Sequence, residues 1–251
     1  MADTETIQGL ARGLRVIEAF GADHPKLSIA EAARLTGLDR ATVRRCLRTL
    51  AELGYASFDG KYFALTQRVL RLGHAWLASA PLPAIVQPVL DRLAAATDES
   101  ASVAVLDGTE IVYVARASRK RVMSIGLAPG SRLPAYCASM GRVLLAALPS
   151  GEAEALLRAS ALVALTPQTK TSLSALRAAM AETRETGFAV IDQELELGLR
   201  SIAVPLVDGS GRTVAALNVG AHAARLTLEA MIADVLPQMR AAQAEIGRLL
   251  G

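Results

Sequence analysis

The sequence is poor in the residues on which metal sites and disulfides depend. Among its 251 residues there are 2 cysteines and 3 histidines, and aromatic residues make up 4% of the chain. Cys46 and Cys137 are far apart in the sequence, and neither has a histidine at the short spacing of metal ligands. We therefore expect no disulfide, no metal, no cofactor, and a reduced, cytoplasmic protein.

Motifs of common enzymes and of membrane proteins are also absent. The chain has no phosphate-binding loop of the form G-x-x-x-x-G-K-[ST] and no G-x-S-x-G nucleophile motif. It has no run of 18 apolar residues and no basic leader followed by an apolar stretch. Neither a membrane span nor export is expected, and the chain is predicted not to be an enzyme.

One alternative gives Cys137 a chemical role. A helix is expected to begin just after this residue, and a helix N-terminus can lower the pKa of a thiol. No general base can be identified for it, because the nearest histidine in the sequence is His74. An enzyme or a redox sensor based on Cys137 is therefore a remote alternative.

The positive charge of the chain is unevenly distributed. The formal net charge is +3. Residues 1–80 hold 11 Lys and Arg against 8 Asp and Glu, whereas residues 81–251 hold 16 residues of each sign. The whole excess thus lies in the N-terminal third, as expected where that part of a protein binds nucleic acid.

Residues 40–48, with the sequence RATVRRCLR, carry four of these arginines. On a helix, the four guanidinium groups and the hydroxyl of Thr42 would share the exposed arc, opposite an apolar face of Val43, Leu47 and Leu50. Such a cationic face fits phosphates and guanine edges in the major groove of DNA. Most arginine runs are simply solvated helix faces, so the neighbouring segments have to decide between the two interpretations.

The preceding residues predict the other helices of a helix-turn-helix. Ser28 and Glu31 have the spacing of a capping box that opens a helix over 29–35. Gly37 lies in a tight turn, and Asp39 can cap the second helix, which would enter the major groove. An earlier helix over 13–20 would pack behind this pair through Leu14, Ile17 and Phe20.

A hairpin completes a winged helix-turn-helix domain over residues 1–65. Two strand-like runs, 55–58 and 61–65, flank Asp59-Gly60, and an Asp-Gly pair between such runs is a strong hairpin signal. The hairpin would bring Lys61 to a phosphate or to the minor groove. The predicted contacts to operator double-stranded DNA are Ser28, Arg40, Thr42, Arg44, Arg45, Arg48 and Lys61.

A linker follows at residues 66–82. Residues 66–79 predict a helix with Val69, Leu72 and Trp76 on one stripe, and the prolines at 81 and 83 end it. The stripe would pack either against its own domain or against a second copy of the chain. A dimer would suit DNA binding, because two winged helices on a symmetric site raise the affinity.

Residues 83–251 mix helix and strand patterns. Hairpin signals at Asp107-Gly108 and at 208–211 predict neighbouring antiparallel strands. The expected strands are 101–107, 110–116, 122–127, 188–192, 201–207 and 212–219, and the expected helices are 85–96, 139–148, 152–159, 172–186 and 226–249. The predicted class is α+β, a largely antiparallel sheet flanked by helices, in a sensing domain.

Along essentially its whole length the sequence resembles the IclR family of transcriptional regulators. The matching segments are GLRVIEAF (13–20), the helix-turn-helix through Leu53-Gly54-Tyr55, LPAYCASMGRVLLA (133–146) and GFAVIDQELELGLRSIAVP (187–205). The segments YVAR (113–116), MSIG (123–126) and PAYCASMGR (134–142) resemble in particular the PcaR/PcaU/PobR subgroup, which controls aromatic-acid breakdown through the β-ketoadipate route.

The resemblance implies a GAF-like effector domain, dimers that often pair into tetramers, and regulation by a small aromatic or dicarboxylic acid. It does not choose between protocatechuate, 4-hydroxybenzoate and β-ketoadipate, nor between activation and repression. The alternative is a regulator of the same fold that senses an unrelated small carboxylate or no ligand.

The segment 133–141 suggests how a carboxylate could bind without a charged side chain. Leu133-Pro134 enforces an extended entry to a helix that begins near Ser139. The N–H groups of Ser139, Met140 and Gly141 would then point outward at the positive end of the helix dipole. Gly141 would let a ligand or a neighbouring strand approach closely. From the residues alone, an ordinary buried helix start capped by Ser139 is the alternative.

The resemblance carries effector contacts onto the backbone of Ser139 and Met140 and onto Leu199, Ser201 and Asn218. Tyr136 or Met123 could pack on an aromatic ring of the ligand.

Four arginines could pair with a ligand carboxylate, namely Arg116, Arg121, Arg132 and Arg200, although residues 119–121 are more simply read as a solvated loop. The last two could instead be structural and pair with Asp192, Glu194 or Glu196.

Overall fold

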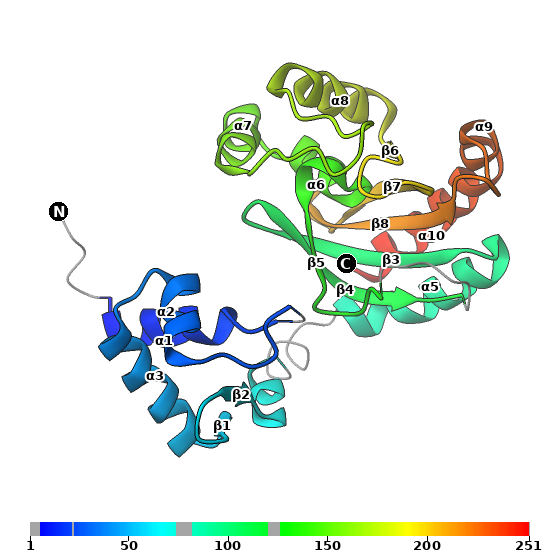
Figure 1. Ribbon diagram of the computed structural model, residues 1–251. Coiled ribbons are helices and arrows are strands. Elements are labelled where there is room, and N and C mark those ends of the chain that lie inside the picture. The colour runs from blue at the N-terminus through cyan, green and yellow to red at the C-terminus, as the bar shows by residue number, and fades with distance from the viewer. Residues whose placement is uncertain (1–5, 22, 74–81, 120–125, 251) are drawn as a thin grey trace. The chain divides into compact units, whose positions relative to one another are not determined.

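The computed structural model describes residues 6–21, 23–73, 82–119 and 126–250, which belong to two compact units, Met1–Ala80 and Pro81–Gly251 (Figure 1). Each unit has its own buried apolar core.

The first unit begins with three helices, α1 (Gln8–Glu18), α2 (Ile29–Thr36) and α3 (Arg40–Glu52). The expected capping box of α2 is confirmed: the Ser28 hydroxyl accepts from the Glu31 N–H, and the Glu31 carboxylate accepts from the Ser28 N–H at 2.8 Å. Gly37 ends α2 at a φ of 68°, which favours glycine. The Asp39 carboxylate caps α3 by accepting from the Thr42 N–H at 2.8 Å.

The core of this unit is built on the predicted face of α3. Val43, Leu47 and Leu50 are all buried. The expectation for α1 is partly wrong, since Leu14 is 45% exposed and Val16 is the fully buried residue. The helix starts five residues before the predicted position, and its buried stripe passes through Val16 rather than Leu14.

The hairpin is confirmed, with strands β1 (Ala56–Phe58) and β2 (Phe63–Leu65) antiparallel to each other. Asp59 shapes the turn, because its carboxylate accepts from the N–H groups of Lys61 and Tyr62. The expected linker helix begins as a 3₁₀ turn, η1 (Gln67–Val69), followed by helical residues 70–73. Trp76 and the other residues at 74–79, which the sequence predicts as helix, lie outside the described residues.

The second unit is built around a six-stranded antiparallel sheet of strand order β5-β4-β3-β8-β7-β6 (Figure 1). Its strands are β3 (Ser100–Asp107), β4 (Glu110–Ala117), β5 (Arg132–Pro134), β6 (Ala189–Asp192), β7 (Leu199–Val207) and β8 (Thr213–His222). Both predicted hairpins are present, as β3–β4 and β7–β8. The strand expected at 122–127 falls mostly outside the described residues. Its described part, 126–127, is not a strand, and β5 is the segment that pairs with β4.

Helices cover both faces of this sheet, as Figure 1 shows. Helices α5 (Leu82–Thr97) and α10 (Leu236–Leu249) pack on one face and enclose one apolar core. Helices α6 (Ser139–Ala147) and α8 (Leu173–Thr186), with α7 (Ser150–Ala159) beside them, enclose a second core on the other face. The sheet is therefore buried from both sides.

The C-terminal segment is not the single helix predicted over 226–249. A short helix α9 (Leu228–Ala230) passes into a π-helical turn, η3 (Met231–Val235), before α10 begins. The Leu236 N–H donates to the Met231 carbonyl, five residues earlier. Pro237 follows directly and has no N–H for the regular bond, so the wider turn comes just before it.

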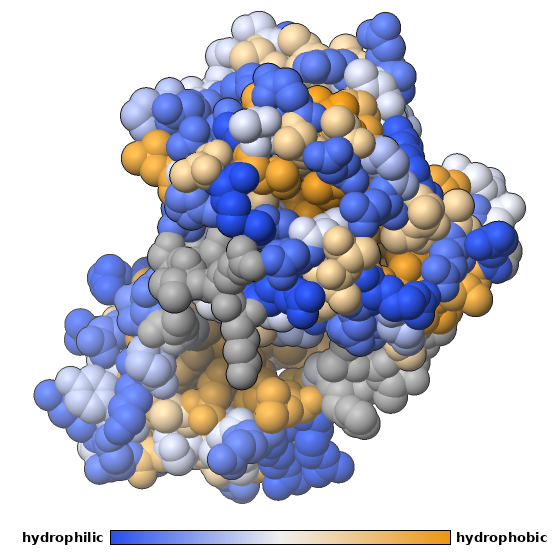
Figure 2. Space-filling view, turned by 90° about the vertical axis from the view of Figure 1, so that its right-hand side faces the viewer, coloured by the Kyte–Doolittle hydropathy of each residue, from blue (hydrophilic) through white to orange (hydrophobic). Residues whose placement is uncertain are grey.

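Hydrophilic residues dominate the face shown in Figure 2, and hydrophobic residues appear there as separate patches. Among the described helices, none is long and apolar enough to cross a membrane. Among the described large apolar residues, Ile7 and Leu70 of the first unit have the largest exposed fractions, both 72%.

Candidate functional site

Small side chains on one face of the sheet lie in the apolar core that α6 covers. Ala104, Ala203 and Ala216 lie there on three adjacent strands, β3, β7 and β8. The register places Arg116 of β4 opposite Ser102 of β3, which in turn is opposite Asn218 of β8. Because directly opposite residues share a face of the sheet, these three polar residues form one row across it.

An irregularity in β3–β4 pairing determines which β4 side chains reach this face. The register shifts between Val103 and Ala104, so that Ala104 pairs with Tyr113 and Val103 with Ala115. In a regular strand, residues three apart point to opposite faces, but the bulge brings Tyr113 and Arg116 to the same face.

A cavity of about 600 Å³, including the part open to solvent, lies between this face and the N-terminus of α6. None of the described residues that line it is acidic. Its lining comprises Ser100, Tyr113, Arg116, Leu127, Leu133, Cys137, Ala138, Ser139, Met140, Ile191, Leu195, Leu199, Ser201, Asn218 and Gly220.

The first turn of α6 leaves its amides free at one end of this cavity. The N-cap Ala138 has no polar side chain, and the N–H groups of Ser139, Met140 and Gly141 donate to no described residue. The Ser201 hydroxyl donates to the Ser139 hydroxyl at 2.9 Å, which joins α6 to β7. Free amides at the positive end of a helix dipole form an anion-binding site.

Arg116 supplies the positive charge of the cavity. Its guanidinium donates to the hydroxyls of Ser102 at 2.9 Å and Ser118 at 3.0 Å, and it forms no ion pair with a described carboxylate. Burial lowers the pKa of Arg116, although the guanidinium remains protonated at neutral pH. A cation whose described side-chain partners are hydroxyls, in a cavity whose described lining holds no acid, can pair with a ligand carboxylate.

Two further polar groups of the cavity have no protein partner among the described residues. The side-chain oxygen of Asn218 is buried and accepts no hydrogen bond. Burial raises the pKa of Tyr113 to about 12, so its phenol is neutral at physiological pH. A ligand hydroxyl could donate to the Asn218 oxygen, and a ligand hydroxyl or a second carboxylate could accept from the Tyr113 phenol.

Five of the expected effector contacts and one expected arginine lie together in this cavity, namely Ser139, Met140, Leu199, Ser201, Asn218 and Arg116. Met123 and Arg121 lie outside the described residues.

Tyr136 and Gly141 do not line the cavity, contrary to expectation. The Tyr136 ring is buried, and its hydroxyl donates to the Val163 carbonyl at 2.7 Å. Gly141 packs against the backbone of Ala135 in the 3₁₀ turn η2 (Ala135–Cys137), so its small size serves the close approach of a neighbouring segment.

Arg132 and Arg200 are structural, as the alternative proposed. Arg200 pairs with Asp192 at 2.8 Å, as expected, and also donates to the Leu226 carbonyl. Arg132 pairs with Asp107 and Glu110 at the surface, because β5 lies beside β4 and not beside β6.

Cys137 lines the cavity, but its buried surroundings disfavour the ionised, reactive thiolate form. Its side chain is fully buried, and burial raises the pKa of the thiol to about 11. The expected lowering of this pKa by the helix start is wrong. A protonated thiol is a poor nucleophile, so the role suggested for Cys137 in catalysis or redox sensing loses its basis.

On α3, the arginines are exposed as predicted. Arg40, Arg44 and Arg48 recur every four residues on one side of the helix, while Arg45 donates to the Thr42 hydroxyl at 3.3 Å. Thr42 itself is 5% exposed, so its expected place on the exposed arc is wrong. It faces the groove between α1 and α3.

The two other predicted DNA contacts lie beyond α3. The Ser28 hydroxyl donates to the Glu31 carboxylate at 2.6 Å within the capping box. Lys61 is exposed on the hairpin, with its ammonium 4.9 Å from the centre of the Tyr62 ring.

Sequence reasoning missed several cavity residues, including Tyr113, Leu127, Leu133, Ile191 and Leu195. Tyr113 reaches the cavity through the β-bulge, and Leu195 lies in a loop without periodicity. The alternation of side chains along β6 would have predicted which face of the sheet Ile191 lies on, once the strand that pairs with β6 was known.

The two units match two parts of one protein family. Residues 9–60 match the IclR helix-turn-helix domain, and residues 74–248 match the bacterial transcriptional regulator IclR C-terminal domain.

Full-length relatives agree with these matches. The Pca regulon regulatory protein of Pseudomonas putida is 45% identical over 245 residues, covering 97% of this chain and 84% of the relative. The p-hydroxybenzoate hydroxylase transcriptional activator of Acinetobacter baylyi is 39% identical over 249 residues, covering 97% and 92%. A crystal structure of an IclR homologue from Microbacterium hydrocarbonoxydans, complexed with 4-hydroxybenzoate, has a TM-score of 0.79 at 25% identity, covering 96% and 98%.

Proposed function

Since the chain belongs to the IclR family of bacterial transcriptional regulators, we propose that it controls genes of aromatic-acid breakdown in response to a small acid. Membership of this family makes it a DNA-binding transcription regulator and not an enzyme. The relatives named for the Pca regulon and for p-hydroxybenzoate hydroxylase support the pathway.

The observation that carries the proposal is the cavity at the start of α6. Free amides of Ser139 and Met140 are suited to a carboxylate, and Arg116, Tyr113 and Asn218 offer polar partners to a second group of the ligand. The effector would be an aromatic or dicarboxylic acid such as protocatechuate, 4-hydroxybenzoate or β-ketoadipate. An unrelated small carboxylate is the second candidate, because the amides recognise the carboxylate and not the rest of the molecule.

We further propose that α3 reads operator DNA and that the protein is cytoplasmic, as this role requires. The proposed domains are 1–65 for DNA binding, 66–82 for the linker and 83–251 for the effector. A homodimer, assembling further as a dimer of dimers, would place two copies of α3 on a symmetric operator. Leu72 is 50% exposed in the described part of the linker, which supports self-association there.

A proline at position 139 tests the amide contact. Ser139 is the first residue of α6, where proline is favoured, and Ala138 before it has the extended backbone that precedes proline readily. Ser139→Pro removes one amide donor and one hydroxyl, whereas Ser139→Ala removes the hydroxyl alone. We expect Ser139→Pro to bind the acid roughly tenfold or more weakly than Ser139→Ala, as for the loss of a hydrogen bond to a charged group.

Calorimetric titration with 4-hydroxybenzoate, protocatechuate and β-ketoadipate measures this difference, and circular dichroism checks that both variants fold. Equal affinity of the two variants for the acid that the parent binds would show that the α6 amides do not hold the carboxylate. Binding of none of the three acids by the parent would reject the effector class.

A further inference from the structure

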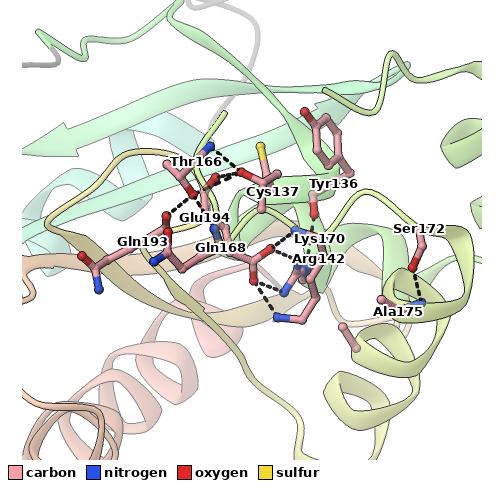
Figure 3. Close-up of polar contacts among 12 residues, drawn as sticks. Tyr136, Cys137, Arg142, Thr166, Gln168, Lys170, Ser172, Ala175, Gln193 and Glu194 are labelled. Carbon is pink, nitrogen blue, oxygen red and sulfur yellow. Dashed lines mark hydrogen bonds and ion pairs between the residues drawn. The ribbon is translucent and has the colours of Figure 1, made fainter. Parts of the chain in front are cut away.

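A buried ion-pair cluster lies behind the cavity. Arg142, in the first turn of α6, makes a two-pronged contact with the carboxylate of Glu194, with N–O distances of 2.9 and 2.5 Å. The two side chains are 4% and 2% exposed. Lys170 adds a backbone N–H at 3.0 Å and its ammonium at 2.8 Å, so the carboxylate accepts from four donors (Figure 3).

The cluster keeps its charge although it is buried. Burial by itself would raise the pKa of Glu194, but hydrogen bonds and positive charge from Arg142 and Lys170 outweigh it and lower this pKa. A buried ion pair is weak evidence for added stability, because desolvation of the charges offsets their attraction. The contacts between the ion pair and the neighbouring segments therefore indicate the role of the pair better than its contribution to stability does.

On one side, Glu194 fixes the segment that follows β6. The Gln193 carbonyl accepts from the Thr166 hydroxyl at 2.6 Å (Figure 3). The Glu194 carbonyl accepts from the Thr169 hydroxyl, also at 2.6 Å. Gln193 has a φ of 59°, and its side chain accepts from the Gly198 N–H. The next residue after Glu194 is Leu195, which lines the cavity.

On the other side, Arg142 fixes the elements that carry the remaining walls. Its Nε donates to the Tyr136 carbonyl at 3.2 Å, directly before the cavity residue Cys137. Ser139, which lines the cavity, lies three residues earlier on α6. The cluster is thus attached to the segments that carry three cavity-lining residues, Leu195, Cys137 and Ser139. The cluster residues Arg142, Glu194 and Lys170 do not line the cavity themselves.

We propose that Glu194 is a positioning residue for effector recognition, which with Arg142 and Lys170 sets the distance between Leu195 and the first turn of α6. This rests on the proposed function, since the effector is the acid proposed there. A pocket recognises its ligand only if its walls are held in place by supporting residues. Loss of the Glu194 charge loosens this support without removing any cavity atom.

The test is Glu194→Gln, which keeps the size of the side chain and removes its charge. The matched control is Glu154→Gln, because Glu154 also pairs with two cations, Arg158 and Arg177, but is partly exposed on α7. In calorimetric titrations with 4-hydroxybenzoate, protocatechuate and β-ketoadipate, Glu194→Gln is expected to bind the parent's acid roughly two- to thirtyfold more weakly. Glu154→Gln is expected to match the parent.

Lys170→Met gives a second, milder variant, since Lys170 is partly exposed and Arg142 remains to hold the carboxylate. It is expected to weaken binding less than Glu194→Gln. If Glu194→Gln fails to fold, Lys170→Met alone decides, and parent-like affinity in it overturns the proposal.

Hydrogen exchange separates positioning from simple stability. In Glu194→Gln, the hydrogen-bonded amides of Gln193, Gly198, Leu199 and Arg142 are expected to exchange faster, while amides of α10 keep the parent rate. Uniform acceleration throughout the second unit would indicate lost stability alone and overturn the proposal. Unchanged exchange at 193–199 would overturn it as well. If the parent binds none of the three acids, the proposed function fails, and hydrogen exchange still decides whether Glu194 holds these segments.

Discussion

Gly141→Ala is expected to destabilise the second unit by about 3 kcal/mol, the upper part of the usual range for overpacking a core. An added Cβ would overlap the Cα and the carbonyl oxygen of Ala135 and lie 2.6 Å from its carbonyl carbon. These are backbone atoms, so no side-chain rotation relieves the overlap. Helix α6 and the turn η2 would have to move apart, although both belong to the cavity wall.

Thermal unfolding measures this effect, and the midpoint should fall by roughly 6–12 °C for a domain of this size. The matched control is Gly151→Ala in α7, where an added Cβ meets no atom within 4 Å and alanine favours the helix. The control should unfold at or slightly above the parent's midpoint. If the unfolding midpoint of Gly141→Ala lies within one degree of that of the control, η2 moves to accommodate the added methyl group without loss of stability.

The second large effect is expected for the double variant Arg44→Ala, Arg45→Ala. Both guanidinium groups are exposed on α3, and each base-contacting arginine contributes about 1–3 kcal/mol. If both contact bases, operator affinity should fall by about 2–6 kcal/mol, and the preference for operator over random DNA should shrink. Fluorescence anisotropy measures both quantities on an operator selected by the parent from random-sequence DNA.

The matched control for this variant is Arg158→Ala, Arg177→Ala, which removes the same charge from α7 and α8. It should bind operator like the parent. Full affinity in the Arg44, Arg45 double variant would remove α3 from the DNA interface.

Signals that act within a few residues predicted much of the fold. The capping box of Ser28 and Glu31, the αL glycine at 187 that ends α8, and the Asp-Gly turns all depend on neighbours in the sequence. Such interactions form in the same way wherever the segment lies in the protein.

Features that depend on distant partners were not predictable in this way. Thr42 is buried because α1 packs beside α3, and no pattern within α3 records this contact. Glu194 was considered as a partner of Arg132 or Arg200, yet it pairs with Arg142, 52 residues away, which sequence reasoning had not singled out. The β-bulge that turns Tyr113 toward the cavity depends on the partner strand as well.

The candidate site likewise has one part that the local sequence predicts and one part that depends on distant partners. The free amides at Ser139 and Met140 follow from the local sequence, because a helix starts after an extended Leu133-Pro134 segment. The identity of the cation in the cavity does not follow from the local sequence, since several arginines remained candidates until their partners were known. Arg132 and Arg200 pair with acids, whereas Arg116 does not pair with a described acid.

The most direct test of the account is a crystal structure of the full chain grown with the acid that it binds most tightly in calorimetry. We predict the carboxylate in the cavity at the start of α6, with an oxygen about 2.7–3.2 Å from the backbone nitrogens of Ser139 and Met140. An acid bound elsewhere in the chain, with this cavity left empty, would contradict the account.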